Sequence, residues 1–306
     1  MRSPDDRLDG VPVAGGEMTR REQRNARRSP LARALRRTAL GLALVVFGLA
    51  AVLGTEAIVA IETVPDDGYV APSPAPRAFG STAITRPPLR YVVLGDSTAT
   101  GEGASYDRGI AISTARELAA ARHRRVTMTN LAVAGARFGD VRRAQLAAAA
   151  RIRPDLVLVA VGANDVTGLT TLGSVRDDLG GIVDGLRAAR CDVAIVVTGS
   201  PDVGSAPRLA QPLRTVAGWR TGQLNGAVRD VAGRDGLVFA PVAQRTGRRF
   251  RADRSLFAAD GFHPSAAGYA TWLPVIEPAL QRALTRRRLA SRACASGGAR
   301  RRSASG

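Results

Sequence analysis

The residues best suited to chemistry lie in four short segments, each close to the end of an apolar run. They are Gly95-Asp96-Ser97, Asn130 through Gly135, Gly162-Ala163-Asn164-Asp165 and Asp260-Gly261-Phe262-His263-Pro264. His263 stands three residues after Asp260, a spacing at which a loop can bring a carboxylate to one imidazole nitrogen and leave the other to act as a base. The alternative interpretation is a turn at the start of a helix, capped by Asp260 or Ser265.

Ser97 gains significance from this pair. A serine hydroxyl is a poor nucleophile unless a base removes its proton. Gly95-Asp96-Ser97 alone is a common turn, but a base and a carboxylate at the same edge of the fold would activate it. We therefore predict Ser97 as nucleophile, His263 as general base and Asp260 as the residue that orients the base. The other histidine, His123, lies among arginines at a predicted helix end, and we interpret it as a solvated surface residue.

Acyl transfer also needs hydrogen-bond donors for the oxyanion of its intermediate. Gly135 ends an apolar run, where the missing side chain lets a backbone N–H face the site, and Asn164 offers its amide. We predict an oxyanion hole formed by these two residues and the Ser97 N–H. Taken singly, Gly135 is also explained by a strand-end turn and Asn164 by an Asx-turn.

Apolar runs rich in β-branched residues alternate with helical patterns from residue 90 onward. The runs are Tyr91–Leu94, Val126–Val133, Leu156–Val161, Val193–Val197 and Leu237–Val242, and the helical stretches are 110–123, 138–151, 174–189, 212–233 and 266–285. This alternation predicts an α/β fold with a five-stranded parallel sheet between helices. In such sheets ligands bind at the carboxyl ends of the strands, and the four segments described above lie close to these ends.

Other candidates carry less. Gly101-Glu102-Gly103 does not complete a dinucleotide fingerprint. Asp165 is expected to brace its loop, and a glycosidase built on Asp165 and Asp260 is a poor rival. Trp219 and Trp272 are expected in the core.

The two cysteines, Cys191 and Cys294, give neither a disulfide framework nor zinc-ligand spacing. We expect Cys191 to pack as a small apolar group at the start of a strand. A Cys191–Cys294 disulfide is the alternative outside the cell.

The N-terminal region contains a run typical of a membrane segment. Residues 38–55 carry no charge, and at about 1.5 Å per residue they span roughly 27 Å, close to the hydrocarbon thickness. Arginines precede the run, and acidic residues without arginine follow it over 56–76. The positive-inside rule then predicts a cytoplasmic basic segment (1–37), a transmembrane signal anchor (38–61) and an extracytoplasmic remainder. Signal cleavage followed by secretion is the alternative.

The remaining boundaries follow from composition. The proline-rich composition of residues 62–89 predicts an extended linker. We expect the folded domain over residues 90–285 and a disordered, arginine-rich tail over residues 286–306. The net charge is +18, from 44 basic residues, all arginine, and 26 acidic ones. Much of the excess lies at the ends, and aromatic residues make up only 4% of the chain. We therefore expect no nucleic-acid partner.

The four segments, in this order, resemble those of GDSL-type esterases of the SGNH hydrolase superfamily over residues 90–283. The resemblance implies a flavodoxin-like three-layer α/β/α domain, with Ser97, His263 and Asp260 as the catalytic set and Gly135, Asn164 and the Ser97 N–H as the oxyanion hole. It implies no metal and no organic cofactor. Thr98 departs from the family, which often has Leu there, but that position packs behind the nucleophile.

We therefore expect a membrane-anchored serine hydrolase of carboxylic esters at the outer face of the cell membrane. Its substrate would be an ester-containing small molecule, a lipid or an envelope glycan. An acyltransferase or carbohydrate deacetylase would use the same site. An alternative of another class is a non-catalytic envelope-binding module that acts through the arginine-rich tail. The sequence gives no indication of oligomeric state.

Overall fold

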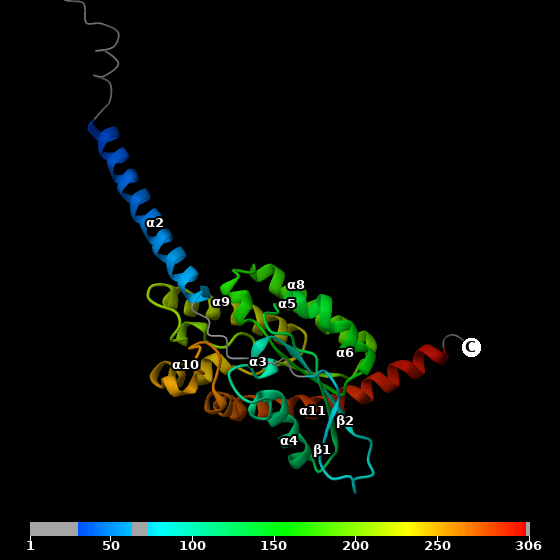
Figure 1. Cartoon of the computed structure of the whole chain (residues 1–306). Coiled ribbons are helices and arrows are strands. Elements are labelled where there is room, and N and C mark those ends of the chain that lie inside the picture. The colour runs from blue at the N-terminus through cyan, green and yellow to red at the C-terminus, as the bar shows by residue number, and fades with distance from the viewer. Residues whose placement is uncertain (1–29, 63–72, 304–306) are drawn as a thin grey trace, which may run out of the picture. The chain divides into compact units, whose positions relative to one another are not determined.

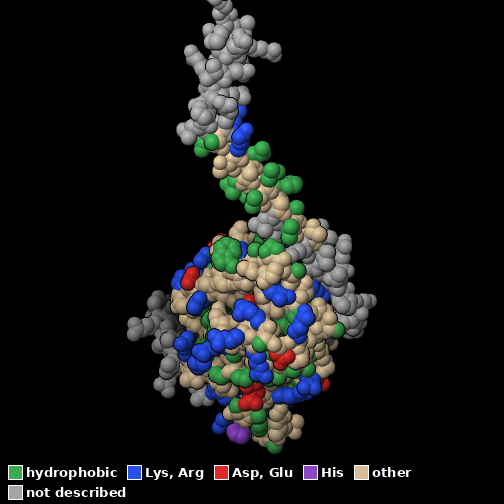
Figure 2. All heavy atoms as spheres, turned by 90° about the vertical axis from the view of Figure 1, so that its left-hand side faces the viewer, with side chains coloured by type: hydrophobic (Ala, Val, Ile, Leu, Met, Phe, Trp, Pro, Cys, Tyr) green, Lys and Arg blue, Asp and Glu red, His purple; other side chains and the backbone are tan. Residues whose placement is uncertain are grey.

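The computed structural model describes residues 30–62 and 73–303, and the chain divides into two units, residues 1–55 and 56–306. In the first unit the described residues belong to helix α2 (Pro30–Glu62). Its stretch Ala34–Val52, 19 residues long and unburied, is long and apolar enough to cross a membrane, a property that signal sequences near the N-terminus share. Figure 2 shows apolar side chains exposed along this helix.

The candidate span overlaps the anchor predicted at 38–61. Residues 1–29 of the predicted cytoplasmic segment and residues 63–72 of the predicted linker lie outside the described residues. The sidedness of the helix stays a prediction.

The second unit contains a six-stranded sheet in the order β1-β3-β2-β4-β5-β6. The strands are β1 (Arg77–Phe79), β2 (Leu89–Gly95), β3 (Val126–Asn130), β4 (Leu156–Ala160), β5 (Ala194–Val197) and β6 (Val238–Phe239). Strands β2 to β6 are parallel and correspond to the five predicted runs. The central strand β4 and residues 91–94 of β2 are apolar and buried because helices cover both faces of the sheet.

The sixth strand, β1, corrects two predictions: the sheet has six strands rather than five, and part of the expected linker at 62–89 belongs to the fold. β1 pairs antiparallel with β3, with Arg77 opposite Met128 and Phe79 opposite Val126. Three residues at a sheet edge leave almost no periodic signal. The neighbouring prolines are tolerated because an edge strand needs few of its N–H groups.

Helices cover both faces of the sheet (Figure 1). One layer contains α4 (Ile110–Arg122) and α11 (Ala266–Ser303), and the other contains α5 (Phe138–Asp140), α6 (Leu146–Ile152), α8 (Leu172–Ala189) and α9 (Leu213–Arg234). α10 (Val242–Ala252) packs against α11. The short helices α3 (Ser97–Thr100) and α7 (Ala163–Thr167) follow β2 and β4. This is the predicted three-layer arrangement.

Three helices differ from their predicted form. The stretch expected at 138–151 is α5, a π-helical turn over Val141–Gln145, and α6. α8 begins at Leu172 and is capped by Thr171, whose side chain accepts a hydrogen bond from the Ser174 N–H. The sequence did not predict α10, because its many arginines leave only a narrow apolar stripe.

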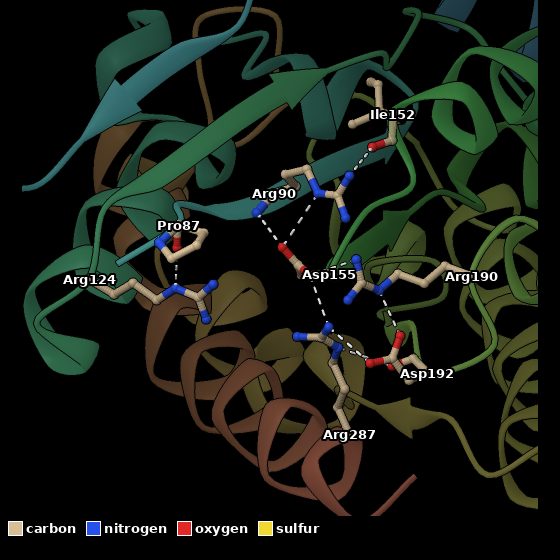
Figure 3. A network of polar contacts seen from close by, with 8 residues as sticks. All are labelled: Pro87, Arg90, Arg124, Ile152, Asp155, Arg190, Asp192 and Arg287. Carbon is tan, nitrogen blue, oxygen red and sulfur yellow. Dashed lines mark hydrogen bonds and ion pairs between the residues drawn. The ribbon is translucent and has the colours of Figure 1, made fainter. Parts of the chain in front are cut away.

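A cluster of ion pairs joins α11 to the amino ends of the strands (Figure 3). Asp155, just before β4, lies 3.7 Å from Arg90, 3.0 Å from Arg190 and 2.9 Å from Arg287. Asp192 pairs with Arg190 at 2.6 Å and with Arg287 at 3.0 Å. Alternating charges of this kind reinforce one another more than isolated surface pairs do.

A disulfide joins Cys191, just before β5, to Cys294, which lies in α11 seven residues after Arg287. Cys191 is exposed before β5, so it does not pack as the expected apolar group. The structure also corrects the expected disordered tail over residues 286–303, since α11 continues to Ser303, and residues 304–306 lie outside the described residues. Arg287 and Cys294, which composition alone assigned to a solvated tail, have partners near the start of β5.

Candidate active site

The turn after β2 places Ser97 at the carboxyl edge of the sheet. Gly95 has a φ of +149°, and a Cβ there would lie 1.9 Å from the carbonyl oxygen of Ala160. Only glycine therefore fits between β2 and β4 at this point. The buried side chain of Gln145 donates to the Gly95 carbonyl at 2.8 Å and accepts from the Gly95 N–H at 2.9 Å. Both backbone groups of Gly95 therefore have hydrogen-bond partners, two residues before Ser97.

Asp96 supports the same turn from below. Its Oδ1 accepts hydrogen bonds from the N–H and the hydroxyl of Thr98, so that Asp96 caps the N-terminus of α3. Its Oδ2 accepts from the Gly162 N–H at 3.2 Å and so links the end of β2 to the end of β4. Asp96 is fully buried, and burial raises the pKa of its carboxyl.

Ser97, His263 and Asp260 form one continuous hydrogen-bonded chain. His263 Nε2 lies 2.9 Å from Ser97 Oγ, and His263 Nδ1 lies 2.5 Å from Asp260 Oδ2. Asp260 Oδ1 accepts from the N–H groups of Phe262 and His263, which fixes the carboxylate within its loop. The structure brings together the three residues that the sequence predicted as a set, although Ser97 and His263 are 166 positions apart.

The electrostatics of the site favour a charged imidazole beside a charged carboxylate. Burial acts to raise the pKa of Asp260, but hydrogen bonds from His263 and Phe262 outweigh it and lower that pKa to about 2. Burial acts to lower the pKa of His263, but the hydrogen bond to Asp260 and the negative charge of Glu102 outweigh it, and the pKa of His263 is raised. Asp260 therefore stays ionised when His263 accepts a proton.

The predicted oxyanion residues follow three neighbouring strands. Gly135 lies in the loop after β3, Ser97 follows β2 and Asn164 lies in α7 after β4, with β2 between the other two strands. Gly135 is exposed, has a φ of +80° and has no atom within 4 Å of a built Cβ. Asn164 Nδ2 donates to the Ala136 carbonyl at 3.1 Å, which connects the two outer loops and leaves the second amide hydrogen for a ligand.

Asp165 braces its loop as expected. It is fully buried, and its Oδ2 accepts a hydrogen bond from the Phe138 N–H at 3.1 Å, at the start of α5. Burial raises the pKa of Asp165 to about 6. Its role is to fix the loop that carries Asn164.

A pocket next to His263 is largely apolar. It is lined by Thr98 and His263 together with four aromatic side chains, Phe250, Phe257, Phe262 and Trp272. Much of its wall comes from the segments 201–206 and 246–257.

The described residues of the second unit have four exposed large apolar side chains: Val133, Leu169, Val216 and Trp219. Val133 precedes Gly135 and Leu169 follows Asn164 in sequence, so two of the four flank the predicted oxyanion residues. Trp219, 64% exposed on α9, was wrongly expected in the core, whereas Trp272 is buried as predicted. Figure 2 shows arginine side chains spread over the face that it presents rather than gathered into one stripe.

Sequence reasoning missed two contributors to the site. Gln145 could have been found from the sequence, because it is a polar residue on the otherwise apolar face of the predicted helix. Glu102 was dismissed with its flanking glycines, and no local pattern shows that it reaches His263. His123 is exposed at the end of α4, as predicted.

The sheet lies between two layers of helices, and a serine, a histidine and an aspartate are hydrogen-bonded to one another at its carboxyl edge. Residues 93–271 match the GDSL-like Lipase/Acylhydrolase family. The match covers more than half of the chain, and the protein belongs to this family.

Relatives agree with this assignment. A GDSL-like esterase of Mycobacterium tuberculosis is 34% identical over 201 residues, which are 64% of this chain and 63% of that protein, so the match spans less than two thirds of the relative. The crystal structure of TesA superposes with a TM-score of 0.52 at 19% identity, over 63% of this chain and 99% of TesA. Phospholipase A1 from Streptomyces albidoflavus gives 0.50 at 22% identity, over 63% of this chain and all of that one. At these identities the two structures establish the fold.

Proposed function

We propose that this protein hydrolyses carboxylic esters through Ser97, His263 and Asp260, with its catalytic domain at the outer face of the cell membrane. The observation that carries the mechanism is the continuous chain of hydrogen bonds from Ser97 Oγ through the imidazole to Asp260. Family membership supports ester hydrolysis independently of this geometry.

In the proposed reaction, Ser97 Oγ attacks the acyl carbon while its proton moves to His263 Nε2. The carbonyl oxygen becomes an oxyanion that accepts hydrogen bonds from the N–H groups of Ser97 and Gly135 and the amide of Asn164. The bond to the leaving alkoxide then breaks, and His263 gives it the proton. A water molecule, deprotonated by the same nitrogen, releases the acyl group and restores Ser97.

The surroundings of Ser97 favour esters with an apolar portion. The aromatic pocket borders His263, and the exposed Val133 and Leu169 lie two residues before Gly135 and five residues after Asn164 in the sequence. Two of the similar proteins, the solved phospholipase A1 and the mycobacterial esterase, are named as enzymes that act on ester bonds. We expect kcat/KM to rise from acetyl to medium-chain esters, since each buried methylene contributes about 0.8 kcal/mol.

Two observations support the proposed location. α2 contains a candidate membrane span, and Cys191 and Cys294 form a disulfide, which persists in oxidising compartments and is rare in the cytosol. A reporter fused after residue 70 should be active only outside the cytoplasm. Reporter activity in the cytoplasm would contradict the proposed sidedness.

The mechanism is tested on the full-length protein in detergent with p-nitrophenyl esters and a fluorophosphonate label. Ser97→Ala should abolish turnover and labelling. The matched control is Ser174→Ala, which removes an exposed hydroxyl from the first turn of α8 and should leave both unchanged. Equal turnover by Ser97→Ala and the unaltered protein would overturn the proposal.

A further inference from the structure

A second carboxylate faces the nitrogen of His263 that binds Asp260. Glu102 Oε1 lies 3.6 Å from His263 Nδ1, compared with 2.5 Å for Asp260 Oδ2. The side chain of Glu102 is 20% exposed and that of His263 is 11% exposed. Glu102 is therefore in close charge–charge contact with the imidazole, in a site that excludes most water, without displacing the hydrogen bond to Asp260.

The backbone of Glu102 is fixed from two sides. Its N–H donates to the carbonyl oxygen of Ser97 at 3.0 Å, so it is tied to the nucleophile itself. Its own carbonyl accepts a hydrogen bond at 2.7 Å from the hydroxyl of Tyr269, a fully buried residue of α11. The approach of Glu102 to the histidine is thus built into the fold and does not depend on a free surface loop.

The flanking glycines make this approach possible. Gly101 and Gly103 have φ values of +86° and +87°, a region that residues with side chains rarely adopt. A Cβ on Gly103 would lie 2.7 Å from the Pro264 carbonyl oxygen and 2.8 Å from His263 Cβ. The segment Gly101-Glu102-Gly103 therefore packs closely against the loop that carries His263.

We propose that Glu102 is a positioning residue of the catalytic site, whose carboxylate stabilises the imidazolium of His263 and accepts the Nδ1–H when Asp260 is absent. This inference rests on the proposed function. The charged groups around His263 are Asp260 on its own loop, Glu102, the buried Asp96 behind the nucleophile turn, and Arg208, whose Nη2 lies 3.7 Å from Asp260 Oδ2. Three carboxylates against one guanidinium favour the charged ring.

The first test is the pH dependence of kcat/KM for the full-length enzyme on a soluble p-nitrophenyl ester. Neutral His263 is the active form, so activity is lost as pH falls through its pKa. Glu102→Gln removes a negative charge that raises this pKa, and the acidic limb should move to lower pH by about one unit. The kcat should fall several-fold with little change in KM.

Two control variants separate charge at this position from charge elsewhere. Glu102→Asp keeps the carboxylate on a shorter side chain and should retain most of the original pH profile. Asp230→Asn removes an exposed carboxylate that pairs with Arg176 on the helical surface and should leave the profile unchanged.

The second test removes Asp260. In Asp260→Ala the Nδ1–H loses its main acceptor, and we expect Glu102 to take its place and sustain a measurable residual rate. Adding Glu102→Gln to this variant should then cost at least about ten-fold, more than it costs in the unaltered enzyme, because residues that share a partner are not additive. Circular dichroism checks that each variant is folded.

The outcomes distinguish the two levels of inference. Coinciding pH profiles for Glu102→Gln and the unaltered enzyme, or purely additive effects with Asp260→Ala, overturn the role of Glu102 even if Ser97→Ala and His263→Ala are inactive. If Ser97→Ala and His263→Ala keep their activity, the proposed function itself fails.

Discussion

The side-chain amide of Gln145 hydrogen-bonds to both the N–H and the carbonyl of Gly95, at 2.9 Å and 2.8 Å. It reaches Gly95 from the π-helical turn between α5 and α6, which displaces the helix register by one residue. A residue 50 positions away in sequence therefore completes the backbone hydrogen bonds at the turn that carries Ser97.

Replacing Gln145 by Met should destabilise the protein strongly. The N–H of Gly95 would stay buried without a partner, while its carbonyl would keep the hydrogen bond from the Val133 N–H at 3.1 Å. A buried donor without a partner costs about 1–3 kcal/mol, and we expect a loss of this size in the free energy of unfolding, measured by denaturant titration. Gln211→Met, at an exposed position, serves as the control. A change of under about 0.5 kcal/mol, typical of surface substitutions, would show that the amide is dispensable.

Two glycine substitutions should have different consequences. In Gly95→Ala the new Cβ would meet the Ala160 carbonyl oxygen at 1.9 Å, and relief requires β2 and β4 to separate, so we expect little folded protein. Gly135→Ala meets no atom within 4 Å and suffers only the backbone strain of its φ of +80°, about 1–2 kcal/mol. It should fold and show a reduced kcat. The soluble yield and the turnover of each variant test these expectations. A fully active Gly95→Ala variant would contradict the steric argument.

The disulfide should stabilise the fold without affecting catalysis. It joins residues 103 positions apart, and disulfides that close long loops typically contribute about 2–4 kcal/mol. Cys191 lies before β5, at the amino ends of the strands, whereas Ser97 lies at their carboxyl ends. Cys294→Ser should lower the melting temperature and leave kcat/KM within about two-fold at 25 °C. Loss of activity in a variant that is still fully folded would refute this separation.

Asp165 should make stability depend on pH in a defined window. Its pKa is about 6 in the folded protein and about 3.9 when exposed, so the folded state binds a proton more tightly. Its contribution to stability therefore rises as pH falls from about 7 to 4. Asp165→Asn keeps an oxygen to accept from the Phe138 N–H and removes the charge. The stability gain of Asp165→Asn over the original should be largest at pH 7 and shrink toward pH 4, as urea unfolding at several pH values will measure.

The fold was largely predictable because both faces of the central strands are buried, which produces continuous apolar runs such as Leu156–Ala160. Elements that bury little could not be found this way. β1 contributes three residues at an edge, and α10 presents only a narrow apolar face among arginines. Trp219 was misplaced because an aromatic residue at a helical position was expected to face the core, whereas it is exposed on α9.

The site was predictable where chemistry restricts residue type. Ser97, Asp260 and His263 were found because a nucleophile, a base and its orienting carboxylate must lie at one sheet edge. Glu102 was not, because only the three-dimensional course of the chain brings its carboxylate to His263. The same limit applies to Arg287, whose partners are 95 or more positions away.

Gly135, Ser97 and Asn164 follow β3, β2 and β4, which are neighbours in the sheet and, as paired strands, lie about 4.8 Å apart. The strand order therefore brings the loops of the three proposed oxyanion donors to one edge of the sheet through main-chain pairing, which nearly every sequence can form. The identities of side chains elsewhere in the core can then differ between relatives, as long as the hydrogen bonds between the strands are kept. TesA shares this fold at only 19% sequence identity, as expected where the backbone rather than particular side chains determines the arrangement.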